Sequence, residues 1–288
     1  MRRAVMARLV CVTCRGELRW TEAEVDGDDV LSALARCADC GARYEVREGV
    51  AIMAAPNAED IWRDSARGLA DALAAEPETE RALMDAPLNA LNGADLAFRG
   101  MVHEARGELA AAAAAFAAAD RQLYGAEQRA CRDELLAACA ERTIGAEWVL
   151  DVASGRGALV EGLARAGVPT VASDLSAVAM LRLRGRLAAA GFAGTVDCLV
   201  ADAAALPFAD GSVPAATTYV GLQNIPDARP VLHELRRACD GSMRTVGYGY
   251  PPEDTTNRRA LEELGFTGSA DLDAVRATAA AADWRMTT

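Results

Sequence analysis

One segment constrains the fold of this chain more than any other: an apolar run that carries an acid near its end and breaks into a glycine-rich turn. The run is Trp148–Val152, with Asp151 as its acid, and Ser154–Gly157 forms the turn. This pattern predicts a buried strand, a tight turn and a following helix. Two more acids, Asp174 and Asp202, follow the next two predicted strands. Acids at three successive strand ends indicate a site for a nucleoside-bearing ligand at the carboxyl edge of a parallel sheet.

Predicted strands and helices alternate through residues 144–288, which is typical of a parallel sheet with helices on both faces. We therefore expect a doubly wound, Rossmann-like α/β domain in this part of the chain. The expected strands cover residues 148–152, 170–173, 195–200, 215–220 and 243–248, and the expected helices cover 158–166, 176–190, 230–239, 256–264 and 272–282.

The eight cysteines divide into two close pairs and four single residues. The pairs are Cys11 with Cys14 and Cys37 with Cys40, two C-x-x-C motifs with 22 residues between them. Four thiolates in this arrangement are typical ligands of a tetrahedral, structural Zn²⁺. A redox motif and a disulfide pair are the alternatives. The first lacks a βαβ context here, and the second lacks a secretion signal.

A wider sequence pattern surrounds the two cysteine pairs. It comprises Leu9, Cys11, Cys14, Gly16, Leu18, Cys37, Cys40, Gly41, Tyr44, Glu48, Gly49 and Val50. With this pattern, residues 1–55 resemble the small zinc ribbons that occur as methyltransferase activator proteins and at the front of some bacterial methyltransferases. Short strands are expected at 17–20, 30–35 and, as a strand, turn and strand, at 43–53. We expect Arg15 and Arg43, which are close in sequence, to offset part of the thiolate charge.

The middle of the chain, residues 56–143, shows no strand alternation and is rich in alanine, the residue with the highest helix propensity. Helices are expected at 58–75, 78–85, 94–119 and 121–140, with breaks at proline and at Asn92-Gly93. We expect this segment to form a helical cap on the sheet domain. A further hypothesis is that the cap supplies the substrate pocket.

The charge balance excludes some classes of partner. The net charge is −12, and each of the three expected segments, 1–55, 56–143 and 144–288, has more acids than arginines. A nucleic-acid partner is therefore disfavoured, because such binders need a positive face. The start of the chain lacks the apolar core of a signal peptide. The longest apolar run, Leu109–Ala119, is short and mostly alanine, so we expect a cytoplasmic protein without a membrane span.

Four motifs beyond the cysteine pairs occur together in the sheet segment. They are residues 149–157 (VLDVASGRG), 172–176 (ASDLS), 201–212 (ADAAALPFADGS) and 221–227 (GLQNIPD). As a set they resemble class I S-adenosylmethionine-dependent methyltransferases. The resemblance implies S-adenosylmethionine as cofactor. The acidic charge and the large helical segment favour a small-molecule substrate, such as one of secondary metabolism.

The first two motifs suit the amino-acid and ribose parts of this cofactor. Gly155 and Gly157 have no Cβ, so the backbone can approach the amino-acid end closely. Asp151 can hold the positive amino group, directly or through water, and the two oxygens of Asp174 can accept from both ribose hydroxyls. Ala153 stands where the family usually has glycine, which is tolerated if φ is not positive there.

The remaining cofactor contacts are expected from the resemblance alone. Asp202 would accept a hydrogen bond from the adenine amino group, and the N–H of Ala203 would reach the ring. Leu175 and Val220 would flank the adenine and the methionine portion.

Two features depart from the family pattern. Residues 212–215 lack the Phe-Asp pair that usually opens the fourth strand. After the fifth strand the sequence shows helical segments and then Trp284–Met286, where the family adds an antiparallel strand pair. We therefore expect another element, a protein partner or a second copy of the chain to complete this edge of the sheet.

No residue stands out as a general base. Methyl transfer is an in-line displacement in which the protein mainly positions the nucleophile and excludes water. An oxygen or nitrogen nucleophile can also need a base. The weak candidates are His103, Tyr124, Tyr219 and His233, residues that are more often structural.

Two alternatives to a small-molecule methyltransferase stay open. The first is an RNA methyltransferase, because bacterial guanine-N1 rRNA methyltransferases also place a zinc ribbon before this fold. The second is a methyltransferase-fold protein that acts as a partner subunit or runs a non-methylating reaction. The departures near the last strand motivate this second alternative.

Overall fold

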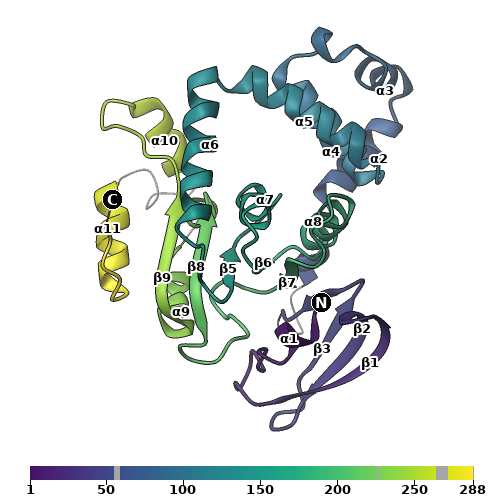
Figure 1. Ribbon diagram of the computed structural model, residues 1–288. Coiled ribbons are helices and arrows are strands. Elements are labelled where there is room, and N and C mark those ends of the chain that lie inside the picture. Colours follow the sequence, from purple (N-terminus) through teal and green to yellow (C-terminus); the bar gives the residue numbers. More distant parts are fainter. Residues whose placement is uncertain (55–58, 226, 264–271, 288) are drawn as a thin grey trace. The chain divides into compact units, whose positions relative to one another are not determined.

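The computed structural model describes residues 1–54, 59–225, 227–263 and 272–287 (Figure 1). The chain forms two compact units, Met1–Ile61 with Leu136–Thr288 and, separately, Trp62–Leu135. The first unit thus joins the expected ribbon to the expected sheet segment. The division into three segments stays a prediction.

A nine-stranded sheet forms the centre of the first unit in the described part of the chain, with the order β1-β2-β3-β4-β7-β6-β5-β8-β9. Its parallel strands are β5 (Val149–Val152), β6 (Thr170–Asp174), β7 (Val196–Val200), β8 (Val213–Tyr219) and β9 (Cys239–Val246). The first of these strands, β5, lies in the middle of the group, so the chain winds outward from it in both directions. This doubly wound order confirms the expected fold class.

Helices cover both faces of the parallel strands, and both faces are buried. The covering helices are α7 (Ala158–Arg165), α8 (Ala177–Ala189) and α9 (Arg229–Ala238). Residues of α7 and α8 pack with Ala172 and Cys198 on one face. On the other face, Leu150 and Leu199 pack with residues of α9 and of the ribbon. Because successive strand residues point to opposite faces, this packing explains the continuous apolar runs that the sequence shows.

The ribbon extends the same sheet. Its strands β1 (Leu18–Asp26), β2 (Asp29–Cys37), β3 (Arg43–Arg47) and β4 (Val50–Ile52) pair antiparallel in chain order. β4 then pairs in parallel with β7, Val50 opposite Cys198 and Ile52 opposite Val200. A short helix, α1 (Arg3–Met6), precedes these strands. The strands at β1 and β2 are longer than expected, and the sequence did not predict the β4–β7 pairing.

The second unit is helical, as expected. It contains α2 (Ser65–Ala74), α3 (Pro77–Met84), α4 (Gly93–Ala105), α5 (Leu109–Leu123) and most of α6 (Ala126–Glu141), with a short 3-10 turn at Leu88–Ala90. Another 3-10 turn, Glu59–Trp62, includes the last residues of the first segment of the first unit and the first residue of the helical unit. The single helix expected at 94–119 is wrong, because the chain turns at Gly107, where φ is +77°. Gly100 of α4 faces the ring of Phe116 in α5, so the two helices pack closely.

After β8 the chain makes a 3-10 turn, Leu222–Asn224, and after β9 it forms α10 (Thr255–Glu263) and α11 (Leu272–Ala281). The indole N–H of Trp284 donates to the carbonyl of Leu232 in α9 at 3.0 Å. In the described residues β9 is the last strand at one edge of the sheet. That a protein partner or a second copy of the chain completes this edge stays a prediction. Leu264 and Pro226, which belong to an expected helix and motif, lie outside the described residues. Among the described helices, none has the length and apolarity needed to cross a bilayer.

Candidate functional site

The end of β5 holds a buried carboxylate. The side chain of Asp151 is 1% exposed, and its two oxygens accept hydrogen bonds from Thr217 Oγ1 and Ser154 Oγ, both at 2.7 Å. The pKa of Asp151 is raised to about 6, mainly because burial disfavours the charged form. The hydrogen bonds from Ser154 and Thr217 lower the pKa, and the charge of Asp174 raises it. The sequence analysis missed Ser154 and Thr217. Both could have been found as hydroxyl side chains among small or apolar neighbours, Ser154 in the glycine turn and Thr217 in strand β8.

The turn after β5 has an unusual backbone. Ala153, Gly155 and Gly157 have φ of 53°, 51° and 80°. The expectation that φ is not positive at Ala153 is therefore wrong. Alanine occupies a left-handed conformation here, at a cost of about 1–2 kcal/mol. A Cβ at Gly155 would meet nothing within 4 Å, so the backbone there borders open space. A Cβ at Gly157 would lie 2.4 Å from Leu183, so that glycine is needed for packing as well.

A second strained residue lies at the end of β8. Val220 has φ of 58°, which is a genuine outlier for a β-branched residue. The next residue, Gly221, lies against the β5 turn, because a Cβ there would be 2.9 Å from the Cβ of Ala153. Strained residues cluster at binding sites more often than elsewhere. The ends of β5 and β8 therefore meet in a strained pair of turns beside Asp151.

The acid at the end of β6 is tied to the first turn. One oxygen of Asp174 accepts from the N–H of Gly155 at 2.9 Å, and the other accepts from the N–H of Ser176 at 3.0 Å. Each carboxylate oxygen can accept a further hydrogen bond, and the side chain is only half-buried. The neighbouring Leu175 is 46% exposed. An exposed leucine next to a carboxylate and an open backbone turn fits a ribose with an attached flat ring.

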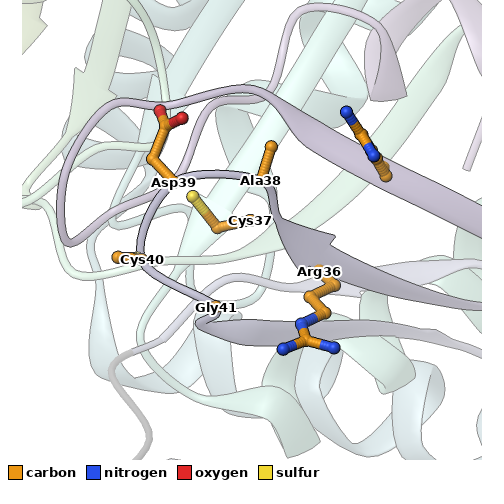
Figure 2. A pocket seen from close by; sticks show the side chains of 7 residues that line it. Arg36, Cys37, Ala38, Asp39, Cys40 and Gly41 are labelled. Carbon is orange, nitrogen blue, oxygen red and sulfur yellow. The ribbon is translucent and has the colours of Figure 1, made fainter.

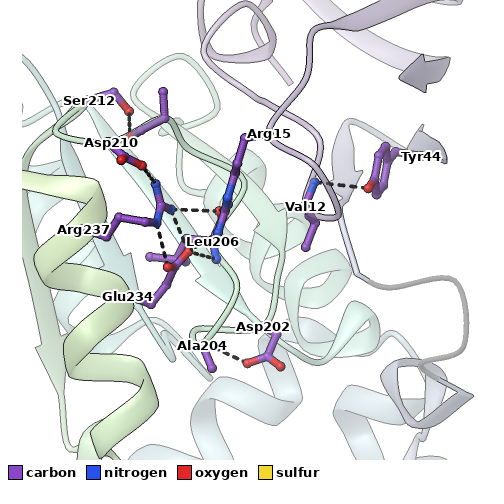
Figure 3. Close-up of polar contacts among 11 residues, drawn as sticks. Val12, Arg15, Tyr44, Asp202, Ala204, Leu206, Asp210, Ser212, Glu234 and Arg237 are labelled. Carbon is purple, nitrogen blue, oxygen red and sulfur yellow. Dashed lines mark hydrogen bonds and ion pairs between the residues drawn. The ribbon is translucent and has the colours of Figure 1, made fainter. Parts of the chain in front are cut away.

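The acid at the end of β7 is exposed. Asp202 Oδ1 accepts from the N–H of Ala204 at 2.9 Å (Figure 3). The backbone carbonyl of Asp202 accepts from the N–H of Ala205. Ala203, between them, is half-buried. The parallel register of β5, β6 and β7 puts all three acids at the same edge of the sheet. The residues at this edge therefore fit the cofactor that the resemblance implies.

The four base candidates differ in their surroundings. Within Trp62–Leu135, His103 Nδ1 contacts Glu108, and the other ring nitrogen accepts from Arg99 Nε at 3.3 Å. In the same unit, Tyr124 is exposed under the guanidinium of Arg132. His233 is exposed in the middle of α9. Histidine nitrogens that are used in this way suit a structural role.

Tyr219 is the candidate that lies at the carboxyl end of a central strand. Its hydroxyl forms a hydrogen bond with the hydroxyl of Tyr248 at 2.7 Å, and the rings meet edge to face. Gln223 holds the backbone of Tyr248 with both ends of its amide, and its Oε1 accepts from the Tyr248 N–H at 2.8 Å. Tyr248 and Gln223 are residues that the sequence analysis did not single out. Their signal was a polar or aromatic side chain just beyond a strand end.

The four expected zinc ligands come together. The sulfurs of Cys11, Cys14, Cys37 and Cys40 lie within 4.8 Å of one another, and all four thiols are free. Figure 2 shows the second of the two turns that carry them. Backbone N–H groups also face the sulfurs: that of Gly16 faces Cys14, and that of Cys40 faces Cys37. Four clustered sulfurs with N–H donors are the donor set that tetrahedral Zn²⁺ prefers.

The arginines near this cluster have different surroundings. The guanidinium of Arg15 binds the Leu206 carbonyl and Glu234. Arg19 and Arg36 line a pocket of about 420 Å³ together with the second cysteine turn. Arg43 is exposed and pairs in register with Arg36. The expected offset of the thiolate charge by Arg15 and Arg43 stays a prediction.

Residues 149–241, which include the glycine turn and the strand-end acids, match the family model described as methyltransferase domain. The chain is similar to the demethylmenaquinone methyltransferase of Paenarthrobacter aurescens, with 39% identity over 98 residues, 34% of this chain and 36% of the relative. The corresponding protein of Thermobifida fusca is 37% identical over 100 residues, which cover 35% of this chain and 42% of the relative. The chain thus spans less than half the length of these curated relatives.

Solved structures of low sequence identity are also similar. Geranyl diphosphate C-methyltransferase from Streptomyces coelicolor A3(2) matches with a TM-score of 0.44 and 17% identity, over 54% of this chain and 62% of that chain. The YcgJ protein from Bacillus subtilis matches with a TM-score of 0.43 and 21% identity, over 52% of this chain and 68% of that chain. The domain match and the methyltransferase relatives together support the expected enzyme class.

Proposed function

We propose that this protein is an S-adenosylmethionine-dependent methyltransferase that acts on a small molecule. The observation that carries the proposal is the Asp174 carboxylate, which the N–H groups of Gly155 and Ser176 hold at the open edge of a methyltransferase domain. Its remaining acceptor positions suit two vicinal hydroxyls. The acids at the ends of the neighbouring strands support the same ligand.

The residues of this edge divide between parts of the cofactor. Asp151 and the backbone at Gly155 and Gly157 would hold the amino-acid end, and Asp174 would hold the ribose. When bound, S-adenosylmethionine supplies an electrophilic methyl group. The protein would contribute orientation and the exclusion of water around the acceptor, which are its main means of accelerating a displacement.

The adenine end would be held by the loop after β7. Asp202 would accept from the amino group and the Ala203 N–H would reach the ring, with the exposed Leu175 against one face. Val220, whose strained backbone lies beside the β5 turn, would contact the methionine portion. These roles rest on the resemblance and on the positions of the side chains at one edge of the sheet.

The cysteine cluster would hold a structural zinc ion. Four sulfur ligands complete a tetrahedral shell and leave no position for a substrate. The metal would therefore stabilise the ribbon, and through β4 the parallel sheet, rather than take part in methyl transfer.

A quinone-like or phenolic compound is the acceptor class to test first. The matched relatives bear the name demethylmenaquinone methyltransferase, and an ionised phenol or its ring carbon needs no strong base. An acceptor that needs no strong base agrees with the site, because Tyr219 is the one base candidate that lies at the end of a central strand. The pair formed by Tyr219 and Tyr248 would orient such an acceptor through its hydroxyls.

A transfer assay tests the activity directly. The zinc-loaded protein is incubated with S-adenosylmethionine and a candidate acceptor. The acceptors are reduced naphthoquinones that lack the methyl group on the quinone ring, or RNA fragments. Formation of S-adenosylhomocysteine is measured by mass spectrometry. We expect turnover with an aromatic small molecule, and a large decrease for Asp174→Asn. Turnover with RNA alone would overturn the small-molecule assignment, and its absence with every acceptor would favour a non-methylating role.

One observation favours RNA as a second candidate acceptor. Arg19, Arg36 and Arg43 lie opposite one another on β1, β2 and β3, so they form one row across the ribbon. All three side chains are exposed, and none has a carboxylate partner among the described residues. Such a row could contact a phosphate backbone. The net charge of −12 opposes this reading, and salt-dependent RNA retention would measure it.

A further inference from the structure

The first cysteine turn touches the loop that follows β7. The N–H of Val10 donates to the carbonyl of Pro207 at 3.0 Å, and Leu9 forms an isolated antiparallel bridge with Phe208. One residue beyond Cys14, the guanidinium of Arg15 donates to the carbonyl of Leu206 (Figure 3). The segment 206–208 is thus held by the ribbon on one side.

Helix α9 holds the same segment on the other side through Glu234. One oxygen of Glu234 accepts from the Leu206 N–H at 2.8 Å, from Arg15 at 2.8 Å and from Arg237 at 2.7 Å. Glu234 is 8% exposed; burial raises the pKa of this carboxyl, but Arg237 and Arg15 outweigh burial and hold the pKa below its usual value. Arg237 also binds Asp210, further along the loop. The buried carboxylate therefore joins ribbon, loop and helix.

The conformation of Arg15 depends on the cysteine turn. Its N–H donates to the carbonyl of Cys11 at 2.8 Å, and its φ is 62°, which is uncommon for arginine. The following N–H, that of Gly16, faces the sulfur of Cys14. A residue in this conformation needs the surrounding turn to hold it. A metal that fixes Cys11 and Cys14 would also fix the direction of the Arg15 side chain.

The other end of the held loop carries the expected adenine contact. Leu206, which is fully buried, lies four residues after Asp202. Between them, the N–H groups of Ala204 and Ala205 both bond to Asp202. This short, hydrogen-bonded path leaves little freedom between the Arg15 contact and the Asp202 carboxylate.

We propose that Arg15 is a positioning residue that couples the zinc site to the adenine side of the cofactor site. The inference rests on the proposed function, and it states that loss of zinc weakens cofactor binding through Arg15, Glu234 and Leu206. Couplings between neighbouring sites commonly change affinity several-fold. The ribbon is then a support for the cofactor loop in addition to being a folding unit.

The test combines metal removal with substitution. S-adenosylhomocysteine is titrated calorimetrically into the wild-type protein, Arg15→Ala and Arg15→Lys, each with zinc and after chelation, and zinc content is measured by mass spectrometry. We expect Arg15→Ala to keep its zinc and to bind the ligand about 5- to 10-fold more weakly. Arg15→Lys, which keeps the charge, should recover part of the affinity. Chelation should weaken binding to the wild type by a similar factor and add little to the loss in Arg15→Ala, because coupled changes are not additive.

Hydrogen exchange supplies a readout that does not depend on the ligand. The amides of 203–206 should exchange faster after chelation and in Arg15→Ala, whereas Arg47→Ala, a change at an exposed arginine of β3, should leave exchange and affinity unchanged. Two results would overturn the coupling. One is an Arg15→Ala variant that binds the ligand as tightly as the wild type. The other is an Arg15→Ala variant whose affinity falls on chelation by the same factor as that of the wild type. A wild type that binds no S-adenosylhomocysteine would instead contradict the proposed function itself. If Arg15→Ala does not fold, chelation of the wild type and Arg15→Lys decide the matter.

Discussion

At the scale of single residues, the sequence identified the strand-end acids but not the groups that hold them. Asp151, Asp174 and Asp202 were visible because acids at the ends of three successive apolar strands are rare, and the structure places all three at one edge of the sheet. The hydroxyls on Asp151 come from Ser154 and, on another strand, from Thr217. The second contact depends on the pairing of β5 with β8, which residue types alone do not specify.

The raised pKa of Asp151 leads to a prediction for pH. If the ionised carboxylate holds the positive amino group of the cofactor, binding requires a pH above its pKa of about 6. Affinity for S-adenosylhomocysteine should therefore be lost as the pH falls through about 6, and it should be roughly tenfold lower at pH 5 than at pH 7.5. The measurement is a calorimetric titration across this range. Asp151→Asn should bind weakly without this pH step, and parallel profiles for the two proteins would refute the role.

At the scale of elements, helix α7 and the turn before it offer two glycines with opposite expected effects. Gly157 has φ of 80°, and a Cβ there would meet buried Leu183, whereas a Cβ at Gly162 in the helix would meet nothing within 4 Å. Gly157→Ala should lower the free energy of unfolding by about 2 kcal/mol. Gly162→Ala should raise it by about 0.5–1 kcal/mol, because alanine is the better helix former.

Urea unfolding of the two glycine variants beside the wild type measures both changes. A Gly157→Ala protein as stable as the wild type would show that the left-handed turn is not required. The same turn limited the sequence analysis, which placed the helix and the glycines correctly but did not expect a positive φ at Ala153. Alanine carries no signal of that conformation, and the nearness of Gly221, which lies in a distant turn, is visible only in the folded chain.

At the scale of the whole molecule, the alternation of strands and helices was enough to predict the doubly wound sheet. It was not enough to predict that the ribbon joins it. Val50–Ile52 reads as a short apolar strand, and only its parallel pairing with β7 shows that it is buried on both faces as part of the sheet. The contact of Arg15 with Glu234 links residues 219 positions apart and was likewise outside the reach of local patterns.

The central claim is that the edge formed by β5, β6 and β7 binds S-adenosylmethionine. The most direct measurement is calorimetric titration of the zinc-loaded protein with S-adenosylhomocysteine, repeated with Asp174→Asn and with Asp240→Asn. Asp240 is an exposed acid at the amino-terminal end of β9, whereas the proposed site lies at the carboxyl ends of the parallel strands, so it serves as the matched control. We predict saturable binding by the wild type and by Asp240→Asn. Affinity should fall about 100-fold in Asp174→Asn, because two charge-assisted hydrogen bonds are weakened. Absence of binding by the wild type, or equal binding by Asp174→Asn, would contradict the claim.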